Sequence, residues 1–219
     1  MLLLSYENLI DPILKNVRQI IPGFADMKSG SSALDVCCGT GAQVIEYGKY
    51  GILATGIDKE QSMLNVALRN KEKLKLVNID FHLADSTALP FNDGSFDYVS
   101  ISFALHDKER EVINRVVSEM KRVVKRDGSL IFIDFQVPLP NNIWAVFART
   151  IEFLVGGSHY QGFRDFSING GIKNILQDHL LFDEKICYLK SGVVEIVKAR
   201  LNTLLNVTAD GFESPTKGL

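Results

Sequence analysis

Hydrophobic and polar positions along the chain form a regular succession of short apolar runs and amphipathic segments. The apolar runs are typical of buried strands and cover 33–38, 52–57, 79–84, 96–103 and 129–135. Segments with apolar residues every three or four positions predict helices over 42–50, 60–68 and 109–125. This alternation predicts a parallel sheet with helices on both faces.

The two ends of the chain depart from the alternation. Residues 1–29 form an N-terminal helical segment, with one helix expected from Asp11 to Ile20 and ended by Pro22 and Gly23. Residues 182–189 and 193–200 alternate with a period of two around a Lys-Ser-Gly turn, which predicts an antiparallel hairpin. The expected fold is therefore α/β and Rossmann-like: a seven-stranded, doubly wound sheet of five parallel strands plus a terminal antiparallel hairpin.

A different kind of segment separates the fifth strand from the hairpin. Residues 136–171 contain an aromatic-rich helix over 143–154 and then a polar and aromatic stretch, 156–166, that we interpret as a loop. A further helix is expected over 172–180. An insertion at this point would lie over the carboxyl edge of the sheet, so we expect it to form a substrate cap.

Length and composition favour one domain over residues 1–219, with a flexible tail at 207–219. The net charge of −2 disfavours nucleic acid as a partner. The three cysteines have neither disulfide nor metal-ligand spacing, so no metal site is expected. Without a signal peptide or an apolar run of membrane-spanning length, the sequence predicts a cytoplasmic monomer or homodimer.

The most informative stretch is the glycine turn after the first strand. Gly39 and Gly41 would let a ligand lie against the main chain where the next helix begins. A dinucleotide would require a third glycine at Val44, and its pyrophosphate would face the carboxylate of Asp35. A cationic ligand suits this turn better. The alternative is a turn that only connects a strand to a helix.

The Asp-x-x-x-Gly-x-Gly arrangement resembles motif I of the class I S-adenosylmethionine-dependent methyltransferases. Asp58 ends the second strand 19 residues after Gly39 and is placed to accept hydrogen bonds from both hydroxyls of an adenosine ribose. Asp58 could alternatively cap the next helix. The block from Ala84 through Val99 resembles the ubiquinone and menaquinone C-methyltransferase branch.

The resemblance implies S-adenosylmethionine as cofactor and S-adenosylhomocysteine as product. It also implies a set of cofactor-binding residues at the ends of the first four strands: Asp35, Cys37, Gly39, Gly41, Asp58, Lys59, Met63, Asp85, Ser86, Ser102 and Phe103. In this reading Met63 lies against the adenine ring and Asp85 accepts from the adenine amino group. Read without the resemblance, Met63 is simply a core residue.

Three residues are candidates for catalysis: His106, His159 and Tyr160. His106 follows the fourth strand and could act as a general base or bind the substrate; alternatively, it caps the next helix or lines the cofactor pocket. Phe163, Arg164 and Phe166 join His159 and Tyr160 as candidates for acceptor recognition.

The resemblance thus predicts a methyltransferase for a small-molecule acceptor, with methylation at carbon, nitrogen or oxygen left open. The alternative is an inactive protein of the same fold that binds S-adenosylmethionine or S-adenosylhomocysteine and acts by binding or assembly.

Overall fold

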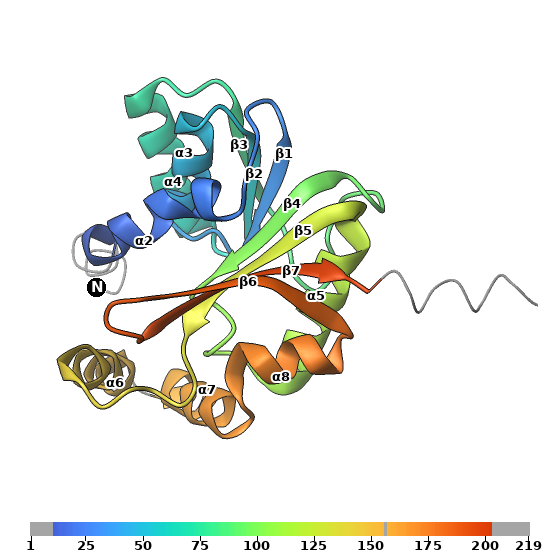
Figure 1. Cartoon of the computed structure of the whole chain (residues 1–219). Helices are drawn as coiled ribbons and strands as arrows, with labels where there is room; N and C mark the ends of the chain where they lie inside the picture. Colours follow the sequence, from blue (N-terminus) through green and yellow to red (C-terminus); the bar gives the residue numbers. More distant parts are fainter. Residues whose placement is uncertain (1–10, 156, 203–219) are drawn as a thin grey trace, which may run out of the picture.

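The computed structural model describes residues 11–155 and 157–202 and contains one seven-stranded sheet (Figure 1). Its strands are β1 (Ser32–Val36), β2 (Leu53–Asp58), β3 (Ile79–Leu83), β4 (Phe96–Ser102), β5 (Val124–Phe135), β6 (Leu181–Leu189) and β7 (Val194–Leu201). The order is β3-β2-β1-β4-β5-β7-β6. The first five strands are parallel, and β7 is antiparallel to both β5 and β6. The predicted five-plus-two sheet is confirmed.

Helices cover both faces of this sheet (Figure 1). They are α2 (Asp11–Phe24), α3 (Ala42–Lys49), α4 (Gln61–Leu74), α5 (Arg110–Val123), α6 (Ile143–Val155), α7 (Gly157–Ile168) and α8 (Gly171–Asp178). One hydrophobic core lies under α2, α3 and α4, and the other lies under α5 and α8. Within the described ranges, no helix is long and apolar enough to cross a membrane.

The strand order reverses between β1 and β4. The chain leaves β1 toward β2 and β3 on one side, and it later returns to place β4 and β5 on the other. In open α/β sheets, ligands bind outside the carboxyl ends of the strands at such a switch point. The connections that follow β1, β2, β3 and β4 therefore form the edge where a site is expected.

Helix α2 is longer than predicted, because Pro22 does not end it. The helix continues to Phe24. Proline lacks the amide hydrogen that would normally bond to the carbonyl of Arg18. That carbonyl instead accepts a hydrogen bond from Gln43 Nε2 at 3.3 Å. The side chain of α3 thus replaces the backbone bond that proline removes.

The loop predicted for 156–166 is wrong over residues 157–166, which belong to α7, and residue 156 lies outside the described residues. The glycine at 162 has a packing role. A Cβ atom at Gly162 would lie 2.7 Å from the carbonyl carbon of Asp107, so only glycine lets α7 approach the loop after β4 this closely. A glycine needed for helix contact therefore looked like a loop signal.

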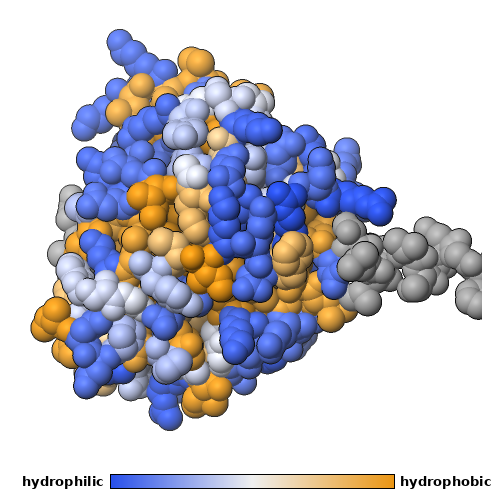
Figure 2. Space-filling model, in the orientation of Figure 1, coloured by the Kyte–Doolittle hydropathy of each residue, from blue (hydrophilic) through white to orange (hydrophobic). Residues whose placement is uncertain are grey.

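Helices α6 and α7 extend beyond the carboxyl end of β5, where Figure 1 shows them below the sheet. Figure 2 shows hydrophobic residues at the surface in this region, among hydrophilic ones. We call α6, α7 and the preceding loop (136–142) the cap. Its assignment as a substrate cap stays a prediction, and residues 1–10 and the tail 207–219 lie outside the described residues.

Candidate functional site

The turn after β1 has an unusual backbone that leaves its main chain open. Cys37, Gly39 and Gly41 all have left-handed backbone angles, with φ of 58°, 53° and 74°. A Cβ atom at Gly39 would meet no atom within 4 Å, whereas one at Gly41 would lie 2.5 Å from the Phe81 ring. Gly39 thus offers bare backbone to a ligand, and Gly41 lets the turn pack onto the core.

The carboxylate of Asp58 lies directly beside this turn. Its Oδ2 accepts a hydrogen bond from the Gly39 amide at 2.8 Å, and its Oδ1 accepts from the Glu60 amide at 2.9 Å. Glu60, not Asp58, is the N-cap residue of α4. Two backbone donors therefore fix the carboxylate at the switch point, and its other lone pairs can accept from a diol.

Asp35 is a second acid of this edge, but it is deeply buried. It pairs with Ser100 across β1 and β4, and the Ser100 hydroxyl donates to its Oδ1 at 2.6 Å. Burial raises the pKa of Asp35 to about 7, against the effects of the Ser100 hydrogen bond and the charge of Arg18, and the charge of Asp58 raises it further. An incoming cation would shift this carboxyl toward its charged form.

Sequence reasoning missed Arg18. This arginine lies on α2, is buried, and lowers the pKa of Asp35 by its charge. Nothing in its local sequence separates it from the other basic residues of an amphipathic helix. Only the packing of α2 across the sheet places it near the turn.

The end of β4 contributes Ser102 and Phe103. The hydroxyl of Ser102 is buried and has no hydrogen-bond partner among the described residues. By strand alternation it lies on the same face of the sheet as Ser100 and Asp35. Phe103 has φ of 50°, and its ring packs on Phe135 at 5.8 Å. An unpartnered buried hydroxyl requires an explanation, and a polar group of a ligand at this end of the sheet would supply the missing partner.

The remaining predicted cofactor residues follow β2 and β3, which are neighbours in the sheet. Lys59 is exposed and Met63 half-buried on the first turn of α4. Asp85 is exposed, and its pKa is lowered because its Oδ1 accepts from the Thr87 amide and hydroxyl, both at 2.8 Å. Ser86 lies near the Cys37 thiol, whose pKa is raised by burial. The structure brings these residues to one edge, and their ligand contacts stay a prediction.

His106 is buried between two carboxylates. Its Nδ1 lies 2.6 Å from Asp134 Oδ1 at the end of β5, and its Nε2 lies 3.5 Å from Glu152 Oε1 on α6. Asp134 is fully buried, and its Oδ2 also accepts the amides of Leu105 and His106 at 3.1 and 3.3 Å. Sequence reasoning missed both carboxylates, because neither lies near His106 in the chain.

This arrangement favours a charged imidazole. Burial opposes the charge, but the charge and hydrogen bond of Asp134, aided by Glu152, raise the pKa of His106 to about 10. A protonated imidazole with both nitrogens engaged cannot accept a proton. In this state His106 joins the sheet to the cap, and the predicted general-base role stays a prediction.

The other candidates lie on α7. Tyr160 is half-buried, and its ring packs against Phe153 of α6 at 5.8 Å. Phe163 is buried and Arg164 exposed, and both line the same cleft as Tyr160. Phe166 instead belongs to the core beside α8. The side chain of His159 lies outside the described residues.

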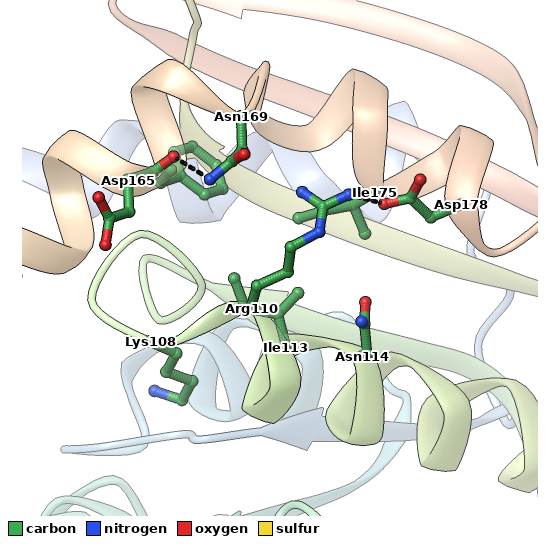
Figure 3. A pocket seen from close by; sticks show the side chains of 10 residues that line it. Lys108, Arg110, Ile113, Asn114, Asp165, Asn169, Ile175 and Asp178 are labelled. Atoms are coloured by element: carbon green, nitrogen blue, oxygen red, sulfur yellow. Dashed lines mark hydrogen bonds and ion pairs between the residues drawn. The ribbon is translucent and has the colours of Figure 1, made fainter.

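A small cavity between α5 and the α7–α8 region is too tight for a substrate. Its volume is about 20 Å³, which is room for about one water molecule. Figure 3 shows Arg110 reaching across it to form an ion pair with Asp178. This cavity marks where α5 meets α8.

The edge of the sheet fits S-adenosylmethionine better than a dinucleotide. Its ligand-facing groups are carboxylates, which can accept from an ammonium group and a ribose diol but would repel a pyrophosphate. The open backbone at Gly39 and the unpartnered hydroxyl of Ser102 leave room and a polar partner for such a ligand.

Comparisons with known proteins agree with this geometry. A family model described as a methyltransferase domain matches residues 33–128. A demethylmenaquinone methyltransferase of Bacillus cereus is 38% identical over 120 residues, which are 52% of this chain and 48% of that protein. One of Bacillus anthracis matches to the same extent. The chain spans about half the length of the curated relatives it matches.

Solved structures share the fold at low identity. A SAM dependent methyltransferase from Aquifex aeolicus has a TM-score of 0.64 and 19% identity, covering 85% of this chain and 90% of that one. The mitomycin 7-O-methyltransferase MmcR has a TM-score of 0.68 and 18% identity, covering 86% and 54%. The cyclase SpnF has a TM-score of 0.56 and 17% identity, covering 85% and 81%. Residues 33–128 of this chain are thus similar to a methyltransferase domain, and the chain as a whole shares the fold of solved S-adenosylmethionine-dependent methyltransferases.

Proposed function

We propose that this protein transfers the methyl group of S-adenosylmethionine to a small-molecule acceptor. The observation that carries the proposal is the fixed carboxylate of Asp58, bonded to the Gly39 amide of an open turn at the switch point. A carboxylate held in this way is preorganised to accept from a ribose diol. The fold alone would not suffice, since the cyclase SpnF shares it.

Each acidic group at this edge of the sheet would bind a different part of the cofactor. Asp58 would hold the ribose, and Asp35 would attract the positively charged amino-acid end of the cofactor. Asp85 would accept from the adenine amino group, and Met63 would cover the ring. The assignment of Asp58 is supported by its position at the end of β2 beside the open turn, whereas those of Asp85 and Met63 come from the resemblance to class I methyltransferases.

When bound, S-adenosylmethionine supplies a methyl group that its sulfonium activates for displacement. The residues of this chain then need only align the acceptor and exclude water, because such a reaction is governed by proximity and orientation. Phe103 and Phe135 form an apolar wall at the end of β4 and β5 that suits this task. His106 is held as a cation by Asp134 and Glu152, so it orients the cap and takes no proton in this state.

A small-molecule acceptor agrees with three features. The net charge is −2, which gives no general attraction for nucleic acid. The cap contains a cleft of the size that small ligands use, with a volume of about 840 Å³. The demethylmenaquinone methyltransferases that match this chain are named for a quinone acceptor, which supports a ring compound as the acceptor.

Titration calorimetry with S-adenosylhomocysteine tests cofactor binding. We expect Asp58→Ala to weaken binding by about 100-fold, since the variant removes an acceptor from the ligand and from two backbone amides. Asp80→Ala is the matched control, because Asp80 pairs with Lys71 on an exposed strand end. Equal affinity for wild type and Asp58→Ala would overturn the proposal.

The alternative is a protein of this fold that binds the cofactor without turning it over. Incubation with methyl-labelled S-adenosylmethionine and a metabolite extract separates the two functions. An enzyme releases S-adenosylhomocysteine in proportion to a labelled product, whereas a binding protein retains the cofactor unchanged.

A further inference from the structure

The cleft in the cap is lined mainly by apolar, aromatic and basic side chains. It lies between α6, α7 and the loop that leaves β5. Val146, Phe153, Tyr160 and Phe163 give it apolar and aromatic walls, and Arg149 and Arg164 are its two charged residues. Among the residues that the structure describes, no acidic side chain lines it. An apolar cleft with a few convergent polar groups is the usual form of a small-molecule site.

The two arginines of the cleft are exposed and form no ion pair with a described carboxylate, as is also true of Arg69, Arg115 and Arg126, but they are the two that share one apolar cleft. Arg110, Arg122 and Arg200 each form an ion pair with a carboxylate. Within residues 11–155 and 157–202, neither Arg149 nor Arg164 has a hydrogen bond or ion pair. Two guanidinium groups without an acid partner in one apolar cleft create a local demand for an anion.

The inner wall of the cleft leads toward the end of β4, which belongs to the edge of the sheet where the predicted cofactor residues lie. We call this the cofactor edge. The ring of Phe163 packs on Phe135 at 5.4 Å and lies 6.3 Å from His106. Phe135 in turn packs on Phe103, the residue that directly follows β4. The three phenylalanine rings pack edge to face and form one continuous apolar wall from the cleft to the end of β4, along which an acceptor held in the cleft can extend toward the cofactor.

We propose that this cleft binds the methyl acceptor and that the acceptor is an aromatic compound with an anionic group. Arg149 and Arg164 hold the anion, and the aromatic walls hold the ring. This inference rests on the proposed function for the identity of the ligand as acceptor, but the binding itself does not depend on turnover. A carboxylate and a phosphate share the required chemistry, since a guanidinium binds either in a bidentate manner.

Calorimetry with matched naphthalene probes tests the proposal in the presence of S-adenosylhomocysteine. The probes are 2-naphthoate, 2-naphthyl phosphate and neutral 2-naphthalenemethanol. We expect at least one anionic probe to bind ten times more tightly than the neutral probe, and the stronger of the two identifies the anion. We expect Arg149→Gln with Arg164→Gln to remove this preference and to leave affinity for the neutral probe unchanged.

Arg69→Gln is the control for the loss of an exposed arginine outside the cleft, because Arg69 lies on α4 at the other end of the sheet. Equal binding of anionic and neutral probes would overturn the inference, and so would equal losses in Arg69→Gln and the double variant. The two proposals fail separately. S-adenosylhomocysteine binding without probe preference contradicts only the anion site, whereas probe preference without S-adenosylhomocysteine binding contradicts only the methyltransferase proposal.

Discussion

The cofactor edge and the cap are built in contrasting ways. At the edge, a single carboxylate accepts hydrogen bonds from backbone amides, as Asp58 does from Gly39 and Glu60. Where the cap meets the sheet, the key contacts join side chains from distant elements, as His106 does with Asp134 of β5 and Glu152 of α6. The difference teaches that backbone groups of the fold position the edge, whereas the junction with the cap depends on particular side-chain pairs.

The largest effect that would sharpen this contrast is expected at His106. We expect His106→Gln to destabilise the protein by about 3–5 kcal/mol, because Asp134 and Glu152 would remain as buried, unpaired carboxylates. Denaturant unfolding measures the change, and His82→Gln, on an exposed position of β3, is the control.

The pH dependence of this effect follows from the raised pKa of His106. A basic group whose pKa rises from 6.5 to about 10 on folding stabilises the protein fully below pH 6.5, and the contribution is lost as pH rises toward 10. The difference between wild type and His106→Gln should therefore shrink between pH 7 and pH 10. A difference that stays constant over this range would contradict a charged His106.

A second pair of variants separates packing from ligand access at the edge. Gly39 and Gly41 share left-handed backbone angles, so alanine strains both, but only at Gly41 does the new Cβ atom meet the core. We expect Gly41→Ala to lose about 2 kcal/mol more stability than Gly39→Ala. Conversely, Gly39→Ala should lower affinity for S-adenosylhomocysteine while it retains most of its stability. Thermal unfolding and calorimetry on the same samples test both parts, and a reversed pattern would refute the open-turn interpretation.

The smallest expected effect is a pH dependence of cofactor affinity. Because burial raises the pKa of Asp35 to about 7, this group is protonated at pH 6 in the free protein and must lose its proton to face a cation. We expect affinity for S-adenosylhomocysteine to rise about tenfold from pH 6 to pH 8 and then to level off. Calorimetry in buffers of different ionisation enthalpy should detect the released proton. Asp35→Asn should abolish the slope, and a slope that persists in that variant would assign it to another group.

Ionisation of Asp35, which favours cofactor binding, has the opposite effect on the stability of the fold. An acid whose pKa is raised in the folded state stabilises the fold at low pH, and this contribution is lost as pH rises from about 4 to 7. Cofactor binding and the fold thus favour different states of Asp35, which is typical of a residue placed for function.

Much of the edge could be predicted from the sequence because its signals are local. Two local signals mark the carboxyl edge of a parallel sheet. One is a strand that runs into glycines, and the other is an acid at the end of the next strand. The predicted sheet of five parallel strands and a terminal antiparallel hairpin followed from the hydrophobic periodicity along the chain, and the structure confirms it. Whether the predicted residues bind the cofactor is for the variants above to decide.

The cap could not be predicted to the same depth, because its determinants are contacts between distant segments. Gly162 favoured a loop in the sequence, although its lack of a side chain serves the contact between α7 and Asp107. Likewise, Pro22 predicted the end of a helix, but the helix continues to Phe24. The Gln43 side chain donates to the Arg18 carbonyl, which proline leaves without its usual backbone donor. In both cases the decisive partner lies far along the chain, where no periodic pattern can reveal it.

The close approach at Gly162 also has a consequence for protein engineering. Because α7 touches the loop after β4 through bare backbone, any larger residue at this position would force α7 and this loop apart and would displace the side chains of α7 that line the cleft. Redesign of acceptor choice should therefore leave residue 162 alone and exchange the side chains that face the cleft.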